Sequence, residues 1–354
     1  MRNIILLCFL SLCFLGGCST SNDTNVSLNL KFEDFNQSKE LIGKKIQYDS
    51  ILNPRKILLK NDYLIVSTDG SKNLLHLLDV NGLEYIQSKG VQGQGPGEIR
   101  SMIWELDRGI DENSFWAYDL NSKIFYEYDL DSKSKYAVRN IRQDKDWFLG
   151  FSINLIDENK FISNVTRDNF KYAIFDSLGN RLDSFGPWAG AGQKVVDEDT
   201  GYLLLGLNQG QIDYNFNNKI LSHSRLRFEL LEINNLENEN TISIYGPKSY
   251  EVKYDVFDSN GMPTANVDSA IPMGYSDVFT GENSVFAVYI GKTNSTITSS
   301  GEMSRTIFEF SLEGKPLSHF TTNYPIKSIC VDEKAKKIYA ITDDKDPGIA
   351  VFEY

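Results

Sequence analysis

The residue types that most often carry chemistry are few in this sequence and lie far apart. Its only histidines are His76, His223 and His319, and no two of them share the short spacing of a metal-binding or catalytic pair. The sequence also lacks a Gly-x-Ser-x-Gly segment, the commonest signature of a hydrolase nucleophile. We therefore assign no catalytic residue and no metal ligand, and we expect each histidine to lie in or beside a strand.

The cysteines offer no catalytic pair either. Cys8, Cys13 and Cys18 lie close to the N-terminus, whereas Cys330 lies alone in the apolar run 326–331. A single cysteine in the folded part cannot form an internal disulfide, so a hydrophobic core must supply the stability. Because no histidine is near Cys330 in the sequence, we interpret it as a core residue and not as a nucleophile.

The N-terminus has the pattern of a removable leader. Arg2 precedes an apolar run over residues 4–15, which is shorter than the about 20 residues needed to cross a bilayer. Gly16 and Gly17 stand directly before Cys18, and this arrangement resembles a bacterial lipobox. The resemblance implies cleavage before Cys18 and acylation of that cysteine; two or more acyl chains give stable anchoring. An ordinary secretory signal with a chance cysteine is the alternative.

The leader predicts both a division of the chain and a location. We expect a lipoprotein signal peptide over 1–17, a lipidated N-terminus and polar tether over 18–42, and one folded domain over 43–354. Ser19 stands where an aspartate would retain a lipoprotein in the inner membrane, so an outer-membrane lipoprotein is predicted. No compact acidic run follows Cys18 as a surface-export signal, which favours the periplasmic face over the cell surface.

Composition predicts an all-β domain with an acidic surface. The 36 Lys and Arg against 48 Asp and Glu give a formal net charge of −12, which disfavours nucleic acid as a partner. No long stretch has helical spacing, whereas short β-branched and aromatic runs recur between Asn, Asp and Gly residues. Examples of these runs are residues 63–67, 115–118, 123–128, 172–175, 227–233, 285–289, 307–310 and 349–352.

The predicted strands repeat. A short polar turn precedes an apolar strand six times, at spacings of 46 to 65 residues, which is typical of four-stranded propeller blades with insertions. A second turn follows the third strand of five units and is missing from the sixth, so that an early strand such as residues 44–49 could complete the last sheet. We predict a six-bladed β-propeller of four-stranded blades closed by an N-terminal strand. A two-sheet sandwich is the alternative.

A family resemblance follows from these features. The lipobox, the six units and the segment Gly-Gln-Gly-Pro-Gly-Glu at residues 93–98 resemble the TolB-like six-bladed propeller lipoproteins of Gram-negative bacteria. The resemblance covers nearly all of the chain after the leader and implies the fold and an envelope location. Members of the family are mostly of unassigned function, so no catalytic residue is transferred. We interpret residues 93–98 as a blade-connecting turn. A phosphate-binding loop lies between a strand and a helix, whereas this segment contains Pro96 and is followed by a predicted strand.

Insertions are concentrated on one face of the predicted propeller, which we call the insertion-rich face. They lie between the second and third strands of blades and between successive blades, opposite the short turns, and long loops on a rigid scaffold often carry function. Aromatic side chains near Arg or Lys on these loops could stack on sugars or peptides and pair with carboxylates. The alternative is that the aromatic residues pack their own loops. The predicted ligand-binding residues are Arg100, Trp147, Arg167, Trp188, Arg225, Tyr250 and Tyr275.

These features favour a non-enzymatic binding module, anchored to a membrane through Cys18, whose partner is a protein or a glycan. A structural assembly subunit is a variant of this hypothesis. The alternative is a calcium-dependent lactonase- or esterase-like hydrolase with its site at the propeller channel, because carboxylates from several blades can gather there without a linear motif. We assign no cofactor to the binding module. The hydrolase alternative would require a calcium ion. The acids near the predicted first strands are Glu105, Asp107, Asp157, Asp213, Asp277 and Asp332.

Overall fold

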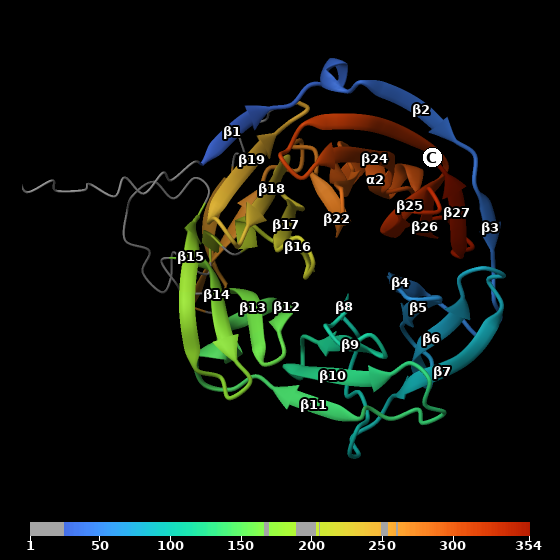
Figure 1. The fold of residues 1–354 in the computed structure, drawn as a ribbon. Helices are drawn as coiled ribbons and strands as arrows, with labels where there is room; N and C mark the ends of the chain where they lie inside the picture. The colour runs from blue at the N-terminus through green and yellow to red at the C-terminus, as the bar shows by residue number, and fades with distance from the viewer. Residues whose placement is uncertain (1–24, 166–169, 189–202, 205, 249–253, 260) are drawn as a thin grey trace, which may run out of the picture.

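The structure is a ring of β-sheets arranged like blades around a central axis (Figure 1). It is a computed structural model that describes residues 25–354 apart from 166–169, 189–202, 205, 249–253 and 260. Within this part of the chain, no helix has both the length and the apolar character needed to span a membrane. The prediction of an all-β, six-bladed propeller is confirmed.

Blades one to three are each continuous in the sequence, and each is an antiparallel sheet of four strands. Their first strands lie nearest the axis and their fourth strands lie at the rim (Figure 1). The strands are β4 (Pro54–Lys60), β5 (Tyr63–Thr68), β6 (Asn73–Asp79) and β7 (Tyr85–Val91) in blade one; β8 (Glu105–Asp107), β9 (Ser114–Asp119), β10 (Ile124–Asp129) and β11 (Arg139–Arg142) in blade two; and β12 (Gly150–Asp157), β13 (Lys160–Val165), β14 (Phe170–Asp176) and β15 (Arg181–Pro187) in blade three.

Blades five and six share one long strand, β25 (Pro316–Asp332), whose first part pairs with β24 and whose second part pairs with β26. This shared strand joins the two blades into a single eight-stranded sheet, in which seven strands follow one path and one strand of the N-terminal segment pairs beside it. The strands are β16 (Gly210–Asn215), β17 (Ile220–Arg225), β18 (Leu230–Asn235) and β19 (Asn240–Tyr245) in blade four; β22 (Tyr275–Thr280), β23 (Ser284–Tyr289), β24 (Ser304–Ser311) and the first part of β25 in blade five; and the second part of β25, β26 (Lys337–Thr342), β27 (Ile349–Glu353) and β3 (Lys44–Ile46) in blade six.

The N-terminal segment, residues 26–46, runs along the rim of blades four, five and six, and we call it the N-terminal strap (Figure 1). Its first strand, β1 (Val26–Asn29), pairs in parallel with β19, and β2 (Gln37–Leu41) pairs in parallel with β25. The third, β3, pairs antiparallel with β27 and supplies the fourth strand of blade six, which confirms the predicted closure. Two segments of the stretch predicted as a tether, residues 26–29 and 37–41, thus pair with strands of the blades.

The core lies between the blades. Apolar side chains from neighbouring sheets form separate buried clusters at the junctions, as expected for sheets that pack face to face. Cys330 is buried and free in the cluster around blade six, which confirms its prediction as a core residue. His76, His223 and His319 lie within β6, β17 and β25, as expected.

The short polar turns work through side-chain acceptors. Asp129 Oδ1 accepts hydrogen bonds from the main-chain N–H groups of Asp131 and Ser132 after the third strand of blade two. Glu98 Oε2 accepts from the N–H of Gly95 at 2.8 Å in the segment between β7 and β8. These residues thus hold tight connections, as the turn chemistry predicts, and residues 93–98 are a blade-connecting turn.

Candidate functional site

The central channel contains the inward carboxylates that the hydrolase hypothesis requires, but each of them accepts main-chain hydrogen bonds. Glu105 Oε2 accepts from the N–H of Ile153 at 3.0 Å, across the junction of blades two and three. Asp107 Oδ2 accepts from the N–H of Leu155 at the same junction. Asp213 of blade four accepts from the N–H of Thr280 in blade five. Asp277 of blade five accepts from the N–H of Ile329 in blade six. These four carboxylates therefore clamp the innermost strand of the following blade.

Two cations cross the channel to the same carboxylates. Arg108 donates to both carboxylate oxygens of Asp213, at 2.9 and 2.8 Å, and so links blade two to blade four. Lys56 Nζ lies 2.8 Å from Asp277 Oδ1 and links blade one to blade five. The charges of Asp213 and Asp277 are thus paired with cations, which compensates for their removal from water.

The donor set of the channel does not fit a calcium ion. Calcium takes about six to eight oxygen ligands, whereas seven of the eight oxygens of these four carboxylates already accept N–H or cationic donors, and Glu105 Oε1 is the exception among the described contacts. The cavity among the inner strands has a volume of about 40 Å³, which is room for about one water molecule. Among the described residues, no three Asp, Glu, His or Cys side chains gather in a metal-binding arrangement. Asp157 and Asp332 lie outside this set, because they stand at strand ends.

Burial shifts the pKa of one of these four carboxylates. Glu105 is almost fully buried, and this desolvation raises its pKa to about 7, with Ser152 and the N–H of Ile153 opposing the shift. A carboxyl that titrates near neutrality can act as an acid or base. Here its Oε2 is bound to the main chain of the next blade, and we treat it as a structural carboxyl.

The described aromatic residues of the predicted ligand site are buried, which corrects that prediction. Trp147 is fully buried, stacks near Phe161 and donates its Nε1–H to Ser163 Oγ at 3.1 Å. Tyr275 packs near Tyr289 and donates to a main-chain carbonyl. Trp188 is buried beside its own loop. The packing alternative therefore holds for these three residues, because large rings next to long loops are needed to cover the ends of the blades.

The two described basic residues of the predicted ligand site lie in different environments. Arg100 is exposed and lies beside the connecting segment of residues 93–98. Arg225 is fully buried at the end of β17 and cannot contact a solvent-borne ligand directly. Arg167, Tyr250 and the predicted lipidation site Cys18 lie outside the described residues.

A buried ionic network joins blades three and four near the insertion-rich face. The carboxylate of Glu232 on β18 accepts hydrogen bonds from Lys171 Nζ on β14, at 2.7 and 2.6 Å, and from Arg225 Nη2 on β17. Tyr172 O–H lies 2.6 Å from His223 Nδ1 and 3.2 Å from Glu232 Oε2. We call these five residues the blade 3–4 network. It holds two cations and one anion in a place that water does not reach.

The charges of this network shift its pKa values. Burial lowers the pKa of Lys171 to about 8, although the Glu232 carboxylate opposes the shift. Burial would raise the pKa of Glu232, but Arg225 and Lys171 lower it to about 2. His223 has its pKa lowered well below the ordinary value by burial and by the two cations, so its ring is neutral at pH 7. Arg225 Nη1 and His223 Nε2 are buried and have no hydrogen-bond partner among the described residues.

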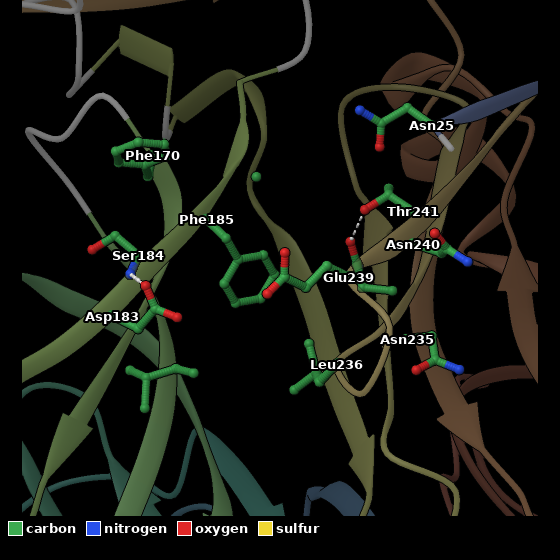
Figure 2. Close-up of a pocket in the computed structure, with 13 residues that line it drawn as sticks. Asn25, Phe170, Asp183, Ser184, Phe185, Asn235, Leu236, Glu239, Asn240 and Thr241 are labelled. Carbon is green, nitrogen blue, oxygen red and sulfur yellow. Dashed lines mark hydrogen bonds between the residues drawn. The ribbon is translucent and has the colours of Figure 1, made fainter. Parts of the chain in front are cut away.

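A groove of about 350 Å³ opens at the rim directly outside this network (Figure 2). One wall is β15 of blade three, and the other is the hairpin that joins β18 to β19 in blade four. Asn25, directly before the N-terminal strap, contributes to its edge. Phe185 lines the groove and packs behind against Tyr172, with ring centres 5.2 Å apart. The groove and the blade 3–4 network therefore share a wall.

The insertion between blades four and five carries a second surface feature. Strands β20 (Tyr254–Ser259) and β21 (Met262–Val267) form a two-stranded sheet that pairs with no other described strand. The register places Tyr254, Val256, Ala265 and Val267 on one face. Val256 is 54% exposed and Phe257, on the other face, is 49% exposed. We call this element the projecting hairpin.

Sequence reasoning missed both features for identifiable reasons. Lys171 and Glu232 are far apart in the sequence, and only the pairing of blades brings them together. The rim groove lies between two elements with short turns and away from the insertion-rich face, where long loops predicted function. One signal was present, because four of the five network residues place a charge or a ring nitrogen within a strand, where buried positions are usually apolar.

Comparisons with known proteins agree with this architecture. The family model described as TolB-like 6-blade propeller-like matches residues 31–334. The structure is similar to that of a member of the DUF4221 family from Bacteroides vulgatus, with a TM-score of 0.59 at 11% identity, covering 89% of this chain and 96% of that one. It is also similar to a putative exported protein from Bacteroides fragilis, with a TM-score of 0.55 at 15% identity, covering 93% of this chain and 99% of that one.

A comparison with curated proteins finds no match. At these identities the two solved structures establish the fold alone, whereas the family model covers most of the sequence. Both comparisons agree with a propeller fold. The chain belongs to the family of TolB-like six-bladed propellers.

Proposed function

We propose that this protein is an envelope-anchored lipoprotein whose propeller serves as a non-enzymatic interaction module for a protein or a glycan. The projecting hairpin is the observation that carries the proposal. A two-stranded sheet that pairs with no other described strand is marginal in water by itself, and large exposed apolar side chains mark interaction surfaces. Val256 and Phe257 therefore expose a surface that a partner would cover.

The charges of the hairpin favour a protein partner at this place. Asp255, Asp258 and Asp268 lie in or beside its two strands, and residues 254–268 contain no Lys or Arg. An apolar, acidic surface is complementary to an apolar surface with a basic rim, and an acidic surface is repelled by nucleic acid and by anionic lipid. The channel supports the non-enzymatic part of the proposal, because its carboxylates are bound to main-chain groups and its volume is too small for a substrate.

Anchoring and location rest on the sequence before the fold. The lipobox at Cys18 supports acylation, and Ser19 supports the outer membrane, with the periplasmic face favoured. The printed description of the Bacteroides fragilis structure as a putative exported protein is in keeping with this location. Mass spectrometry of the membrane fraction tests the anchor. An N-terminal acylated Cys18 peptide is expected, and a soluble protein with a free Cys18 would contradict it.

Site-specific photocrosslinking tests the interaction surface in intact cells. A photoreactive residue at position 256 should give a discrete adduct, while the same residue at position 138, where the native Val138 is 59% exposed on blade two, should not. The adduct should disappear in a Phe257→Asp variant that retains its melting temperature. Absence of an adduct at position 256, or equal adducts at both positions, would contradict a docking role for the hairpin.

A further inference from the structure

The rim groove between blades three and four is a second surface that is built from more than one blade. Its volume of about 350 Å³ is within the range of small-molecule sites, about 300 to 1,000 Å³. Phe170, which is 45% exposed, and Phe185 stand on the blade three side, and Asn235, Glu239 and Thr241 stand on the blade four side (Figure 2). The groove thus combines ring faces with amide, hydroxyl and carboxylate groups.

The charge of the groove restricts its ligand. Asp183 and Glu239 line it on opposite walls, and among the described residues that line it none is Lys, Arg or His. Lys171 lies behind the wall at Gly186, where its charge is already paired with Glu232. A phosphate, sulfate or uronate ligand would meet two carboxylates on the described walls, which disfavours an anionic ligand.

Two polar groups of the groove are available to a ligand. Asn235 Oδ1 accepts hydrogen bonds from the N–H groups of Glu237 and Asn238, which fixes the side chain and leaves its NH₂ group as a donor. Glu239 extends toward Phe185 in Figure 2, and its carboxylate oxygens are hydrogen-bond acceptors. A ligand with neighbouring hydroxyl groups, which both donate and accept, satisfies this donor and this acceptor at once.

The blade 3–4 network holds the ring of Phe185 in place. Tyr172 packs against Phe185 from behind, and its hydroxyl is fixed by His223 and Glu232. Gly186 is also constrained, because its φ is +77° and an added Cβ would lie 3.1 Å from Tyr172. The buried polar groups, which contribute little net stability, therefore support a rigid aromatic surface at the edge of the groove.

We propose that this groove binds a neutral saccharide, with a sugar ring against Phe185 and its hydroxyl groups on Asn235 and Glu239. The inference rests on the proposed role as an interaction module and names the class of one ligand. The apolar C–H face of a sugar suits a phenyl ring, and its hydroxyl groups suit amide and carboxylate partners. A basic peptide is the competing ligand, since it would be attracted to the two carboxylates.

Titration of the purified protein with defined probes tests this proposal. The probes are neutral hexose and N-acetylhexosamine trimers, a uronic acid trimer and a tri-lysine peptide, measured by calorimetry at 50 and 300 mM salt. At least one neutral trimer should bind, with an affinity that changes less than twofold between the two salt concentrations. Binding of the peptide alone, or no binding of any neutral trimer at 10 mM, would overturn the proposal.

Variants locate the bound sugar. Phe185→Ala and Glu239→Gln should each weaken binding at least tenfold, and Phe185→Tyr should retain it. Phe257→Ala, which removes an exposed ring from the projecting hairpin, is the matched control and should leave the affinity unchanged. Glu239→Gln is expected to fold like the wild type, because Glu239 lies in an exposed turn. It therefore keeps the test valid if Phe185→Ala destabilises the protein. Equal affinity in the wild type and in Glu239→Gln and Phe185→Ala would place the sugar elsewhere and overturn the assignment.

The outcome is separable from that of the proposed function. The hairpin crosslink at position 256 depends on a surface in another insertion, and saccharide binding does not use it. Loss of the crosslink with retained saccharide binding would remove the protein-docking role and leave the groove. Retained crosslinking without saccharide binding would do the reverse.

Discussion

The junction between blades two and three and the junction between blades three and four both involve blade three, but they are built differently. At the first, an apolar cluster includes Trp116, Trp147 and Phe161. At the second, the buried apolar cluster contains five residues, among them Tyr172 and Tyr214. The second junction instead buries the charged blade 3–4 network and opens into the rim groove.

This difference separates stability from binding. Burial of apolar rings stabilises the contact between two sheets without a cost for removing charges from water, and the first junction is built from such rings. Buried ion pairs give little net stability, because the loss of hydration offsets their attraction. Their presence at the second junction is explained if they fix the wall of a groove. Directional hydrogen bonds hold a side chain in one orientation more firmly than apolar contacts do.

Removing the central ring of the first junction should have the largest effect. Trp147→Ala deletes a fully buried side chain and its hydrogen bond to Ser163, and we expect a loss of about 3–5 kcal/mol in the free energy of unfolding. Denaturant unfolding measures it, with Phe148→Ala, a largely exposed neighbour, as the control. A loss below about 1 kcal/mol would remove the distinction between the two junctions.

Removing the charge at the centre of the second junction should cost nearly as much. Glu232→Gln leaves Lys171 and Arg225 buried without a counter-charge, and we expect a loss of about 3 kcal/mol at pH 7. Because the pKa of Glu232 is lowered from 4.5 to about 2, its contribution is present above pH 4.5 and is lost as the pH falls toward 2.

The pH dependence identifies the source of this loss. The wild type should lose stability over that acid range, and the difference from Glu232→Gln should shrink there. Glu239→Gln, an exposed acid on the same blade, should show no such difference. A constant gap between wild type and Glu232→Gln from pH 7 to pH 3 would contradict the charge assignment.

A channel clamp at the first junction should respond in the opposite direction. The pKa of Glu105 is raised from 4.5 to about 7, so its ionisation destabilises the fold as the pH rises through this range. Glu105→Gln keeps an acceptor for Ile153 N–H and should stabilise the protein by about 1–3 kcal/mol at pH 8, with little gain at pH 4. Glu112→Gln in an exposed turn is the control, and a gain equal at both pH values would contradict the assignment.

Calcium should have the smallest effect. Since the channel carboxylates are occupied by N–H groups, Lys56 and Arg108, we expect millimolar calcium or chelator to move the melting temperature by less than about 1 °C. Metal analysis of the purified protein accompanies the measurement. A stoichiometric ion with a chelator-sensitive melting point would revive the channel hydrolase hypothesis.

The sequence was informative where structure is local. The turns with Asp and Asn acceptors predicted the strands and the number of blades, because turn chemistry depends on a few adjacent residues. The pairing of Lys44–Ile46 with β27 followed from a missing strand. Burial of Trp147 and Tyr275 could not be predicted, because a ring beside a loop has the same local pattern whether it faces solvent or the core. The blade 3–4 network and the groove depend on contacts between blades, which no local pattern contains.

The N-terminal strap has a consequence for the order in which the molecule is assembled. β3 is among the first strands to be synthesised, yet its partner β27 is the last strand of the chain. Blade six therefore keeps an open edge until residues 349–353 arrive, and closure of a loop of that length is entropically slow. The ring cannot close before residues 349–353 are available, so early and late segments of this propeller must both be present before blade six can lock the fold.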